Sequence, residues 1–285
     1  MQATEISSAA EIILSCWNAR TTIEALPANM RPHDRAEGYA VQAALAAQSG
    51  DRVVGWKIAA TSVVGQQHIG VDGPLAGRLL ARQVLFDAGS IAASGAGTSL
   101  LPDVPTDVPT ASPTVPLTGN LMRVAEAEFV FRLGQPLPSR STPYTLGEVS
   151  AAVSALHLGI EVPDSRFSDF AHAGMGQLIA DNACTDWFVL GEPVASEWRS
   201  LDLAAHKVTV RCDGRLAAEG VGANVLGSPW FALVWLVNEL STFGPGLLAG
   251  EIVTTGTCIT PIPIRPGQRI EADFGVLGRI AARLT

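Results

Sequence analysis

The stretch that most constrains the fold runs from Val124 to Leu133, where apolar residues alternate with glutamates. Successive side chains of a β-strand point to opposite faces, so this alternation predicts a strand with one apolar face and one face that carries Glu126 and Glu128. The predicted apolar face consists of Ala125, Ala127, Phe129, Phe131 and Leu133. Residues two apart on a strand are about 6.5–7 Å apart, so both carboxylates could bind one hard divalent cation such as Mg²⁺ or Mn²⁺. The alternative is the exposed face of an edge strand, where paired glutamates are ordinary.

The composition indicates a globular chain that acts on a small molecule. Of the 285 residues, 47% are hydrophobic and 16% are charged, which excludes a disordered or coiled-coil protein. The formal net charge of −8 argues against nucleic acid as a partner. No apolar run approaches the ~18–20 residues of a membrane span, and the first residues include Glu5 and Glu11 rather than a basic segment. We therefore expect a cytoplasmic protein without a membrane partner.

The cysteines and histidines form no recognisable site in the sequence. The four cysteines lack a CxxC spacing, and the five histidines lack the HxH and HExxH spacings. The sequence therefore predicts neither a disulfide framework nor a zinc or histidine-rich metal centre.

Helical patterns are concentrated in residues 1–50. Apolar residues recur at helical spacing from Thr4 to Ala19. Asp34 and Glu37 have the form of a capping box, which opens a second helix that Gly50 would end. We therefore predict a small helical N-terminal region.

Strand patterns dominate the second half of the chain. Asp213-Gly214 is a strong hairpin signal, and residues from Arg269 to Leu284 alternate in two short strands. With few helices between the strands, we predict an α+β fold in which a mixed sheet, curled into a roll or sandwich, occupies residues 51–285. A stretch rich in proline and threonine, residues 94–119, is predicted to be a surface excursion of this domain.

A further helix signal follows the strand from Val124 to Leu133. Thr145 and Glu148 fit a capping box, apolar residues follow at helical spacing, and Gly159 would end the helix. Ile160 to Val162 would then be a strand, with Glu161 between two β-branched residues. Glu161 is either an isolated surface charge or the third carboxylate of a metal site.

Two more charged residues are candidates for function. Lys57 is the one interior charge of an apolar stretch from Arg52 to Ala60. It could reach water from an edge strand, or it could be a partly buried ammonium that binds an anionic substrate or transfers a proton. Asp72 lies in a turn-rich loop from Gly70 to Gly77, where aspartate most often makes a structural Asx-turn.

Short stretches from about Gly55 to the C-terminus occur in a distinctive order. They are Gly55-Trp56-Lys57-Ile58, Thr61-Ser62, Gly70-Val71-Asp72, Glu126-Ala127-Glu128, Ile160-Glu161-Val162-Pro163-Asp164-Ser165-Arg166, Asp181-Asn182-Ala183, Leu226-Gly227 with Pro229, and Thr255-Gly256-Thr257. Taken together, this order resembles the 2-keto-4-pentenoate hydratase family, within the fumarylacetoacetate hydrolase superfamily. The resemblance covers most of the chain.

The resemblance implies a mixed β-roll or sandwich and an Mg²⁺ or Mn²⁺ site. The carboxylates that match the metal ligands are Glu126, Glu128 and Glu161. The resemblance also implies that Lys57 and Asp72 act on the substrate.

The same resemblance suggests Arg166, Asp181 and Thr257 as substrate-binding residues, and two positions depart from it. Close hydratases carry Ser where this chain has Cys184, so a serine-dependent proton relay is in question and we expect Cys184 to pack. His68 lies where the hydratases have Gln. Carbon–carbon hydrolases of the wider superfamily use a loop His to activate water, but a solvated or structural His68 is the simpler interpretation.

The implied activity is hydration of a 2-hydroxy-2,4-dienoate, or of its 2-oxo tautomer, to a 4-hydroxy-2-oxoacid. Such a substrate can chelate a hard cation, which acts as a Lewis acid. A 4-oxalocrotonate-type decarboxylase or an acylpyruvate hydrolase would need the same chelate, so both stay open. A catalytically silent assembly partner is a further alternative, against which the intact Lys57 and glutamates argue. Family members are homo-oligomers, so we expect self-association.

Overall fold

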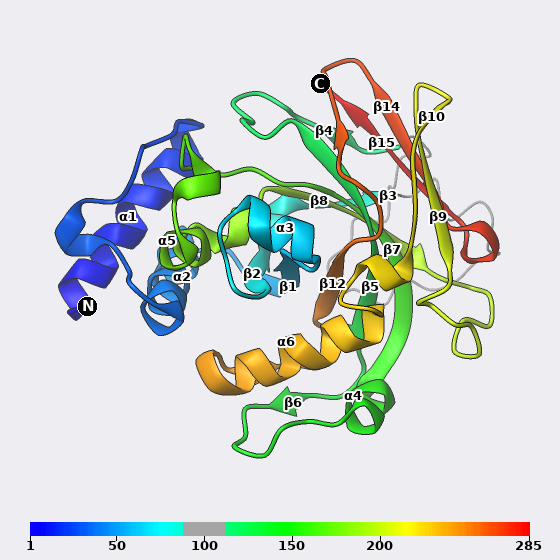
Figure 1. Cartoon of the computed structure of the whole chain (residues 1–285), viewed down its shortest axis with the longest axis horizontal. Helices are drawn as coiled ribbons and strands as arrows, with labels where there is room; N and C mark the ends of the chain where they lie inside the picture. The colour runs from blue at the N-terminus through cyan, green and yellow to red at the C-terminus, as the bar shows by residue number, and fades with distance from the viewer. Residues whose placement is uncertain (88–111) are drawn as a thin grey trace.

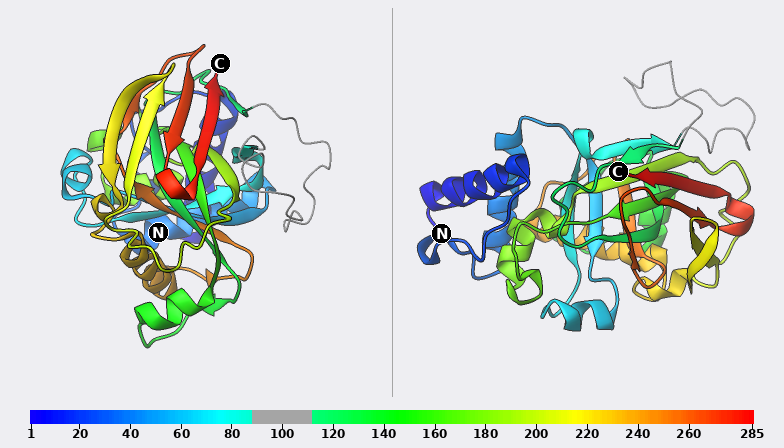
Figure 2. Two further views of the ribbon diagram at one scale, coloured as in Figure 1. Left: turned by 90° about the vertical axis from the view of Figure 1, so that its right-hand side faces the viewer. Right: turned by 90° about the horizontal axis from the view of Figure 1, so that it is seen from above.

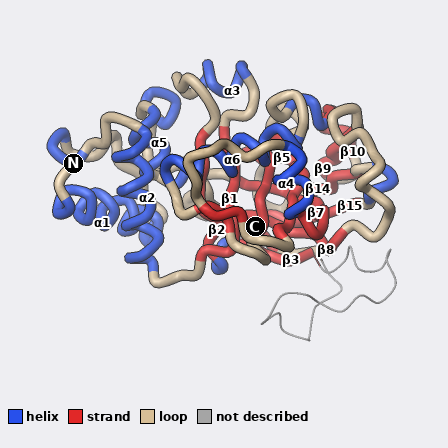
Figure 3. Tube along the Cα trace, turned by 90° about the horizontal axis from the view of Figure 1, so that it is seen from below, coloured by secondary structure: helices blue, strands red, loops and turns tan. Residues whose placement is uncertain are grey.

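The computed structural model of the chain describes residues 1–87 and 112–285. Its helices are α1 (Ala3–Ala19), α2 (Arg35–Ser49), α3 (Val63–His68), α4 (Leu146–Ala152), α5 (Met175–Ala180) and α6 (Pro229–Phe243). Its strands are β1 (Val53–Ala59), β2 (Leu75–Leu80), β3 (Val84–Asp87), β4 (Thr114–Val115), β5 (Val124–Leu133), β6 (Leu137–Pro138), β7 (Val153–Val162), β8 (Trp187–Pro193), β9 (Lys207–Cys212), β10 (Arg215–Val221), β11 (Gly246–Leu247), β12 (Ile252–Thr257), β13 (Ile262–Pro263), β14 (Arg269–Asp273) and β15 (Arg279–Leu284). Helices α1, α2 and α5 gather at one end of the molecule, and the sheets form the rest (Figure 1, Figure 3).

The first two helices begin and end close to the predicted positions. The Asp34 carboxylate accepts a hydrogen bond of 2.8 Å from the backbone N–H of Glu37, and Gly50 ends α2 in the left-handed region with a φ of 67°. Helices α1 and α2 pack on each other, and α2 packs on α5, around a core of their own. Because this core includes Phe167 and Ala180 from later in the chain, the division of the chain at residue 50 stays a prediction.

Strand β5 lies inside the larger sheet, whose order is β2-β1-β12-β5-β7-β8-β3, with β13 also paired to β5. It pairs antiparallel with β12 on one side and with β7 on the other. The predicted apolar face is buried: Ala125, Ala127, Phe129, Phe131 and Leu133 are all 1% exposed or less. The strand is therefore predicted correctly. The alternative, an exposed face on an edge strand, is wrong, because β12 and β7 flank the strand and Glu128 on its second face is 0% exposed.

The helix predicted between Thr145 and Gly159 is about half as long as expected. Helix α4 has the predicted capping box, but it ends at Ala152, and β7 begins at Val153. Every residue from Leu156 to Val162 is buried, as in a strand inside a sheet, and the large apolar side chains recur at every second position, which is the period of a strand: Leu156, Leu158, Ile160 and Val162. Pairing along most of β5 thus outweighs the helical spacing of the local sequence.

The second sheet has the order β10-β9-β14-β15-β4, and its long strands lie side by side in Figure 2. The predicted hairpin joins β9 to β10 through Asp213 and Gly214, whose φ angles of 51° and 77° suit a tight turn of the primed type. Side chains of the two sheets meet in one core, where the rings of Phe129 and Phe274 lie 5.2 Å apart, edge to face. The fold is the predicted α+β roll of mixed sheets.

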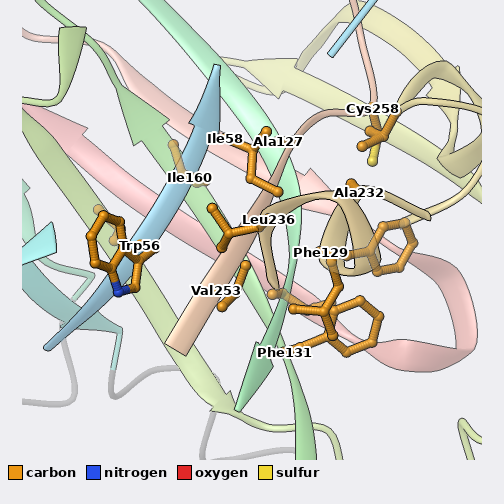
Figure 4. Close-up of a cluster of buried hydrophobic side chains, with 14 of the residues drawn as sticks. Trp56, Ile58, Ala127, Phe129, Phe131, Ile160, Ala232, Leu236, Val253 and Cys258 are labelled. Atoms are coloured by element: carbon orange, nitrogen blue, oxygen red, sulfur yellow. The ribbon is translucent and has the colours of Figure 1, made fainter. Parts of the chain in front are cut away.

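Helix α6 covers another part of this core. Ser228 caps it by accepting a hydrogen bond from the N–H of Trp230, and Pro229 occupies its first turn, as predicted. The Trp230 ring stacks on Phe131 at 4.2 Å between centroids. Leu236 of the same helix belongs to the buried cluster shown in Figure 4.

The sequence analysis also made predictions about membrane-spanning segments and about residues 94–119. In the described part of the chain, no helix is long and apolar enough to cross a membrane. Residues 94–111 of the proline- and threonine-rich stretch lie outside the described residues. Its last residues include β4, which pairs in parallel with β15.

Gly77 lets β2 approach the loop that follows α5. A Cβ atom at Gly77 would lie 2.3 Å from the backbone oxygen of Asn182 and 2.6 Å from Oγ1 of Thr185. We expect Gly77→Ala to displace this loop and to lower the free energy of unfolding by about 1–3 kcal/mol. Gly147→Ala in α4 is the matched control, because a Cβ there would meet no heavy atom within 4 Å. Thermal unfolding should show a lower Tm for Gly77→Ala alone; equal Tm values would contradict the close approach.

Candidate metal centre

Three carboxylates from two neighbouring strands converge in the larger sheet. Glu126 and Glu128 lie on β5 and share a face, and the register of β5 with β7 places Glu161 directly opposite Glu126. One carboxylate oxygen from each residue lies within 4.8 Å of those of the other two. Oxygen ligands at such separations suit a hard divalent cation. The structure thus brings together the three glutamates that the sequence suggested.

The convergent carboxylates are largely buried. Glu128 is 0% exposed and Glu161 is 1% exposed, while Glu126 is half-buried. Oε2 of Glu128 accepts hydrogen bonds from Thr254 Oγ1 and from the backbone N–H of Gly256. In contrast, Oε1 of Glu128 and Oε2 of Glu161 have no hydrogen-bond partner among the described residues. Buried carboxylate oxygens without donors are costly, and a bound cation would satisfy them.

The Lys57 side chain lies in the same buried cluster. Lys57 is 3% exposed, so the interpretation in which it reaches water from an edge strand is wrong. Its Nζ forms an ion pair of 2.9 Å with Oε1 of Glu161 and donates a hydrogen bond of 3.0 Å to the backbone oxygen of Ala183. A single ammonium therefore compensates part of the negative charge of the three glutamates.

The crowding of charges changes the proton affinities of this cluster. Burial, followed by the negative charge of Glu161, raises the pKa of Glu126 to about 7. Burial also raises the pKa of Glu128 well above its ordinary value, and both neighbouring glutamates act in the same direction. Burial alone would lower the pKa of Lys57, but the carboxylates, Glu161 first, outweigh it and hold this pKa above its ordinary value. The cluster thus favours an additional positive charge, as a proton or as a metal cation.

A strained loop positions the carbonyl group that holds Lys57. Asn182, Ala183 and Cys184 all have positive φ angles, of 55°, 51° and 60°. The Asn182 side chain anchors this loop to β2, because its Oδ1 accepts from the N–H of Arg78 at 2.6 Å and its Nδ2 donates to the Arg78 oxygen at 2.7 Å. Left-handed backbone at residues other than glycine needs such support from its surroundings. Sequence reasoning did not assign Asn182 or Thr254 a role, although the Asp181-Asn182-Ala183 and Thr255-Gly256-Thr257 stretches pointed to both segments.

The structure places three other candidates around this loop. Cys184 is buried, which raises the pKa of its thiol to about 12, and packing is the role that we expected for it. The Asp181 carboxylate accepts hydrogen bonds from the Ser165 hydroxyl, the Arg166 backbone N–H and the indole N–H of Trp17. Arg166 is 2% exposed and forms an ion pair with the carboxylate of Asp164. Asp181 therefore holds the segment after β7 in place.

Of the remaining candidates, Thr257 lies in the sheet beside Glu128, whereas Asp72 and His68 are exposed. Thr257 pairs in register with Glu128, and its hydroxyl donates to the backbone oxygen of Ile259. Asp72 is exposed, and its closest ion-pair partner among the described residues is Arg35, at 3.7 Å. His68 is exposed at the end of α3. Among the described residues, no hydrogen bond or ion pair joins Asp72 or His68 to the three glutamates.

Comparison with known proteins decides the family. Residues 82–285 match the family model described as fumarylacetoacetate (FAA) hydrolase C-terminal. The 2-keto-4-pentenoate hydratase of Paraburkholderia xenovorans (strain LB400) is 32% identical over 231 residues, which cover 81% of this chain and 76% of the relative. The chain belongs to the 2-keto-4-pentenoate hydratase family of the fumarylacetoacetate hydrolase superfamily.

Hydratase-family members also include decarboxylases. The 4-oxalocrotonate decarboxylase of Pseudomonas sp. (strain CF600) is 29% identical over 82% of this chain and 78% of the relative. The structure of 4-oxalocrotonate decarboxylase from Pseudomonas putida G7, complexed with magnesium and adipate, superimposes with a TM-score of 0.83 over 100% of this chain and 99% of that chain, at 24% identity. This superposition confirms the fold predicted for a hydratase-family member.

The stabilisation of this hydratase-family protein by Mg²⁺ should grow with pH. Because the pKa of Glu126 is raised from 4.5 to about 7, the folded metal-free protein keeps a proton that the unfolded chain has already released. This contribution to stability is fully present below the unfolded pKa and is lost as the pH rises through the folded pKa. Mg²⁺ competes with that proton, so it should raise Tm more at about pH 8 than at about pH 5.5.

Glu126→Gln should lose most of this Mg²⁺-dependent rise in Tm. Glu219→Gln, at an exposed position of β10, is the matched control and should keep it. A full Mg²⁺ response in Glu126→Gln would remove Glu126 from the ligand set. Equal responses of the wild type at both pH values would contradict the raised pKa of Glu126.

Proposed function

We propose that this chain is a divalent-metal-dependent lyase that adds water to a 2-hydroxy-2,4-dienoate of the 2-oxopent-4-enoate type, in the degradation of aromatic compounds. The observation that carries this proposal is the convergence of three buried carboxylates beside the Lys57 ammonium. The hydratase relatives support the reaction type. The all-oxygen ligand set supports Mg²⁺ or Mn²⁺ as the metal.

Hydration protonates two carbon atoms, C5 and then C3, and forms one new carbon–oxygen bond. The dienol gains a proton at C5 and loses the proton of its 2-hydroxyl group, which gives a conjugated 2-oxo-3-enoate. Water then adds its oxygen at C4 and a proton at C3, so the product is a 4-hydroxy-2-oxoacid. A divalent cation held by Glu126, Glu128 and Glu161 would supply Lewis acidity toward the 2-oxo carboxylate unit.

The residues of the chain would bind the substrate and move these protons. The Lys57 Nζ, already 3.0 Å from the Ala183 oxygen, would bind the negative charge of the substrate or deliver a proton. Asp72 is the proposed acid–base partner, because it matches the family residue of that role in the resemblance described above; its side chain is 83% exposed. Thr257, in register with Glu128, supports a substrate contact at the edge of the centre. Arg166 is a candidate of the same kind, with its backbone held by Asp181.

The assembly and location of the protein belong to the same proposal. We propose a homo-oligomer that works in the cytoplasm on a small 2-oxoacid or dienoate. The resemblance to a family of homo-oligomeric enzymes supports the first part, and the sequence composition supports the second.

Decarboxylation of a 4-oxalocrotonate-type substrate is the second candidate function. The 29% identical decarboxylase relative favours it, and such a substrate has the same 2-oxo carboxylate unit. The two reactions differ in what happens at the far end of the substrate: one adds water and the other releases carbon dioxide.

We expect the purified protein with Mg²⁺ to consume 2-hydroxypenta-2,4-dienoate. Loss of the dienol absorbance would follow the reaction, and mass spectrometry should find a product heavier by one water. Chelator and Glu126→Gln should both abolish it. An untouched dienol would sink the hydratase proposal for this substrate, and release of carbon dioxide from 4-oxalocrotonate would then establish the decarboxylase.

Lys57→Met should lower kcat at least about 100-fold, which is the scale of a lost general acid or base. The chain has one other lysine, Lys207, at the exposed start of β9, so Lys207→Met is the matched control and should keep its kcat. The Mg²⁺-dependent rise in Tm should persist in Lys57→Met, because Lys57 is not among the proposed ligands. A variant with unchanged kcat would exclude Lys57 from catalysis.

A further inference from the structure

Strand β12 has a β-bulge where it passes Glu128. Thr254 of β12 pairs with Val130 of β5. Glu128, two residues before Val130, pairs with Thr257, so β12 carries one more residue than β5 over this interval. Gly256 lies in this bulge with a φ of 98°, and a Cβ atom there would lie 2.4 Å from a neighbouring side-chain oxygen, so the position requires glycine.

The bulge directs two donors at the same oxygen of Glu128. Oε2 of Glu128 accepts hydrogen bonds from the Thr254 hydroxyl and from the backbone N–H of Gly256. Glu128 and Thr254 are both 0% exposed, so bulk water does not compete for this oxygen. The other oxygen, Oε1, is buried and has no hydrogen-bond partner among the described residues. One oxygen of this carboxylate is therefore held by the protein, and the other is left for a cation.

Glu161 has the same asymmetry between its two oxygens. Its Oε1 lies 2.9 Å from Nζ of Lys57, whereas its Oε2 has no partner within the described part of the chain. Each of the two buried glutamates thus offers a single oxygen to a metal. Mg²⁺ demands a near-ideal octahedron of ligands, whereas Ca²⁺ takes a larger and more variable number of oxygens and accepts both oxygens of one carboxylate. Single-oxygen ligands therefore favour the smaller ion.

We propose that Thr254 is a positioning residue that restricts Glu128 to one metal-binding oxygen, so that this centre prefers Mg²⁺ to Ca²⁺. Thr254 acts through Glu128, because Oε2 cannot turn toward a cation without losing the hydrogen bonds of the bulge. An ion held through single oxygens also keeps coordination positions open for a substrate that chelates through its 2-oxo carboxylate unit. This inference rests on the metal-dependent function proposed above.

The test is calorimetric titration of the full-length protein, freed of metal by a chelator, with Mg²⁺ or with Ca²⁺ at about pH 8. The wild type should bind Mg²⁺ more tightly than Ca²⁺. Thr254→Val keeps the shape of the side chain without the hydroxyl, and it should weaken Mg²⁺ binding about tenfold, the scale of a lost partner of a metal ligand. Ca²⁺ binding should weaken less, because the released Oε2 can join Oε1 on the larger ion.

Three further variants separate the hydroxyl from general damage to β12. Thr255→Val is the matched control, because Thr255 is also 0% exposed but its hydroxyl donates to the backbone oxygen of Phe129, at 3.0 Å. This control should bind both ions like the wild type. Thr254→Ser keeps the hydroxyl and should keep the Mg²⁺ affinity, whereas Thr254→Ala lacks it and should repeat the loss seen in Thr254→Val.

Three outcomes would overturn the role of Thr254. The first is equal Mg²⁺ affinity in the wild type and in the two variants without the hydroxyl. The second is a loss in Thr254→Ser or Thr255→Val as large as that in Thr254→Val, which would trace the effect to the strand. The third is a wild type that binds Ca²⁺ as tightly as Mg²⁺. A wild type that binds neither ion would instead contradict the metal-dependent function itself, so the two failures are distinguishable.

Discussion

The burial of three carboxylates against one lysine is the constraint on which the rest of the structure depends. Like charges repel strongly where water is scarce, so Glu126, Glu128 and Glu161 need positive charge or donors nearby. The fold supplies the Lys57 ammonium, and the N–H of Gly256 reaches one oxygen of Glu128. It supplies no donor among the described residues for other oxygens of the same cluster. Because the negative charge is only partly compensated, the cluster destabilises the metal-free fold and attracts a cation.

The loop of residues 182–184 holds Lys57 in place beside the carboxylates through its backbone. The carbonyl group of Ala183 fixes Lys57, and three successive left-handed residues aim that carbonyl. Each residue other than glycine in this conformation costs about 1–3 kcal/mol, so the conformation persists only where the surrounding structure holds it. Asn182 provides this support by two hydrogen bonds to the backbone of β2, and Gly77 leaves the space that the loop needs. The position of Lys57 thus depends on residues outside the cluster of three carboxylates.

Local patterns predicted those parts of the fold that local interactions decide. The caps at Asp34 and Ser228, the hairpin through Asp213-Gly214 and the strand from Val124 to Leu133 all lie where the sequence indicated. The helix predicted to run to Gly159 ends at Ala152 for a physical reason. The segment that begins at Val153 has both a helical and an alternating apolar pattern, and its long-range pairing with β5 stabilises the strand. The same long-range pairing turned the supposed edge strand into a central one.

The sequence by itself determined the chemistry that is available: three carboxylates, one lysine in an apolar stretch, and an order of short stretches that identified the family. Only the tertiary structure decided which of these groups meet. The register of β5 with β7 sets Glu161 opposite Glu126, burial removes Lys57 from water, and Asp72 stays on the surface. Charge proximity and solvent access arise from non-local packing, and one-dimensional spacing does not encode either of them.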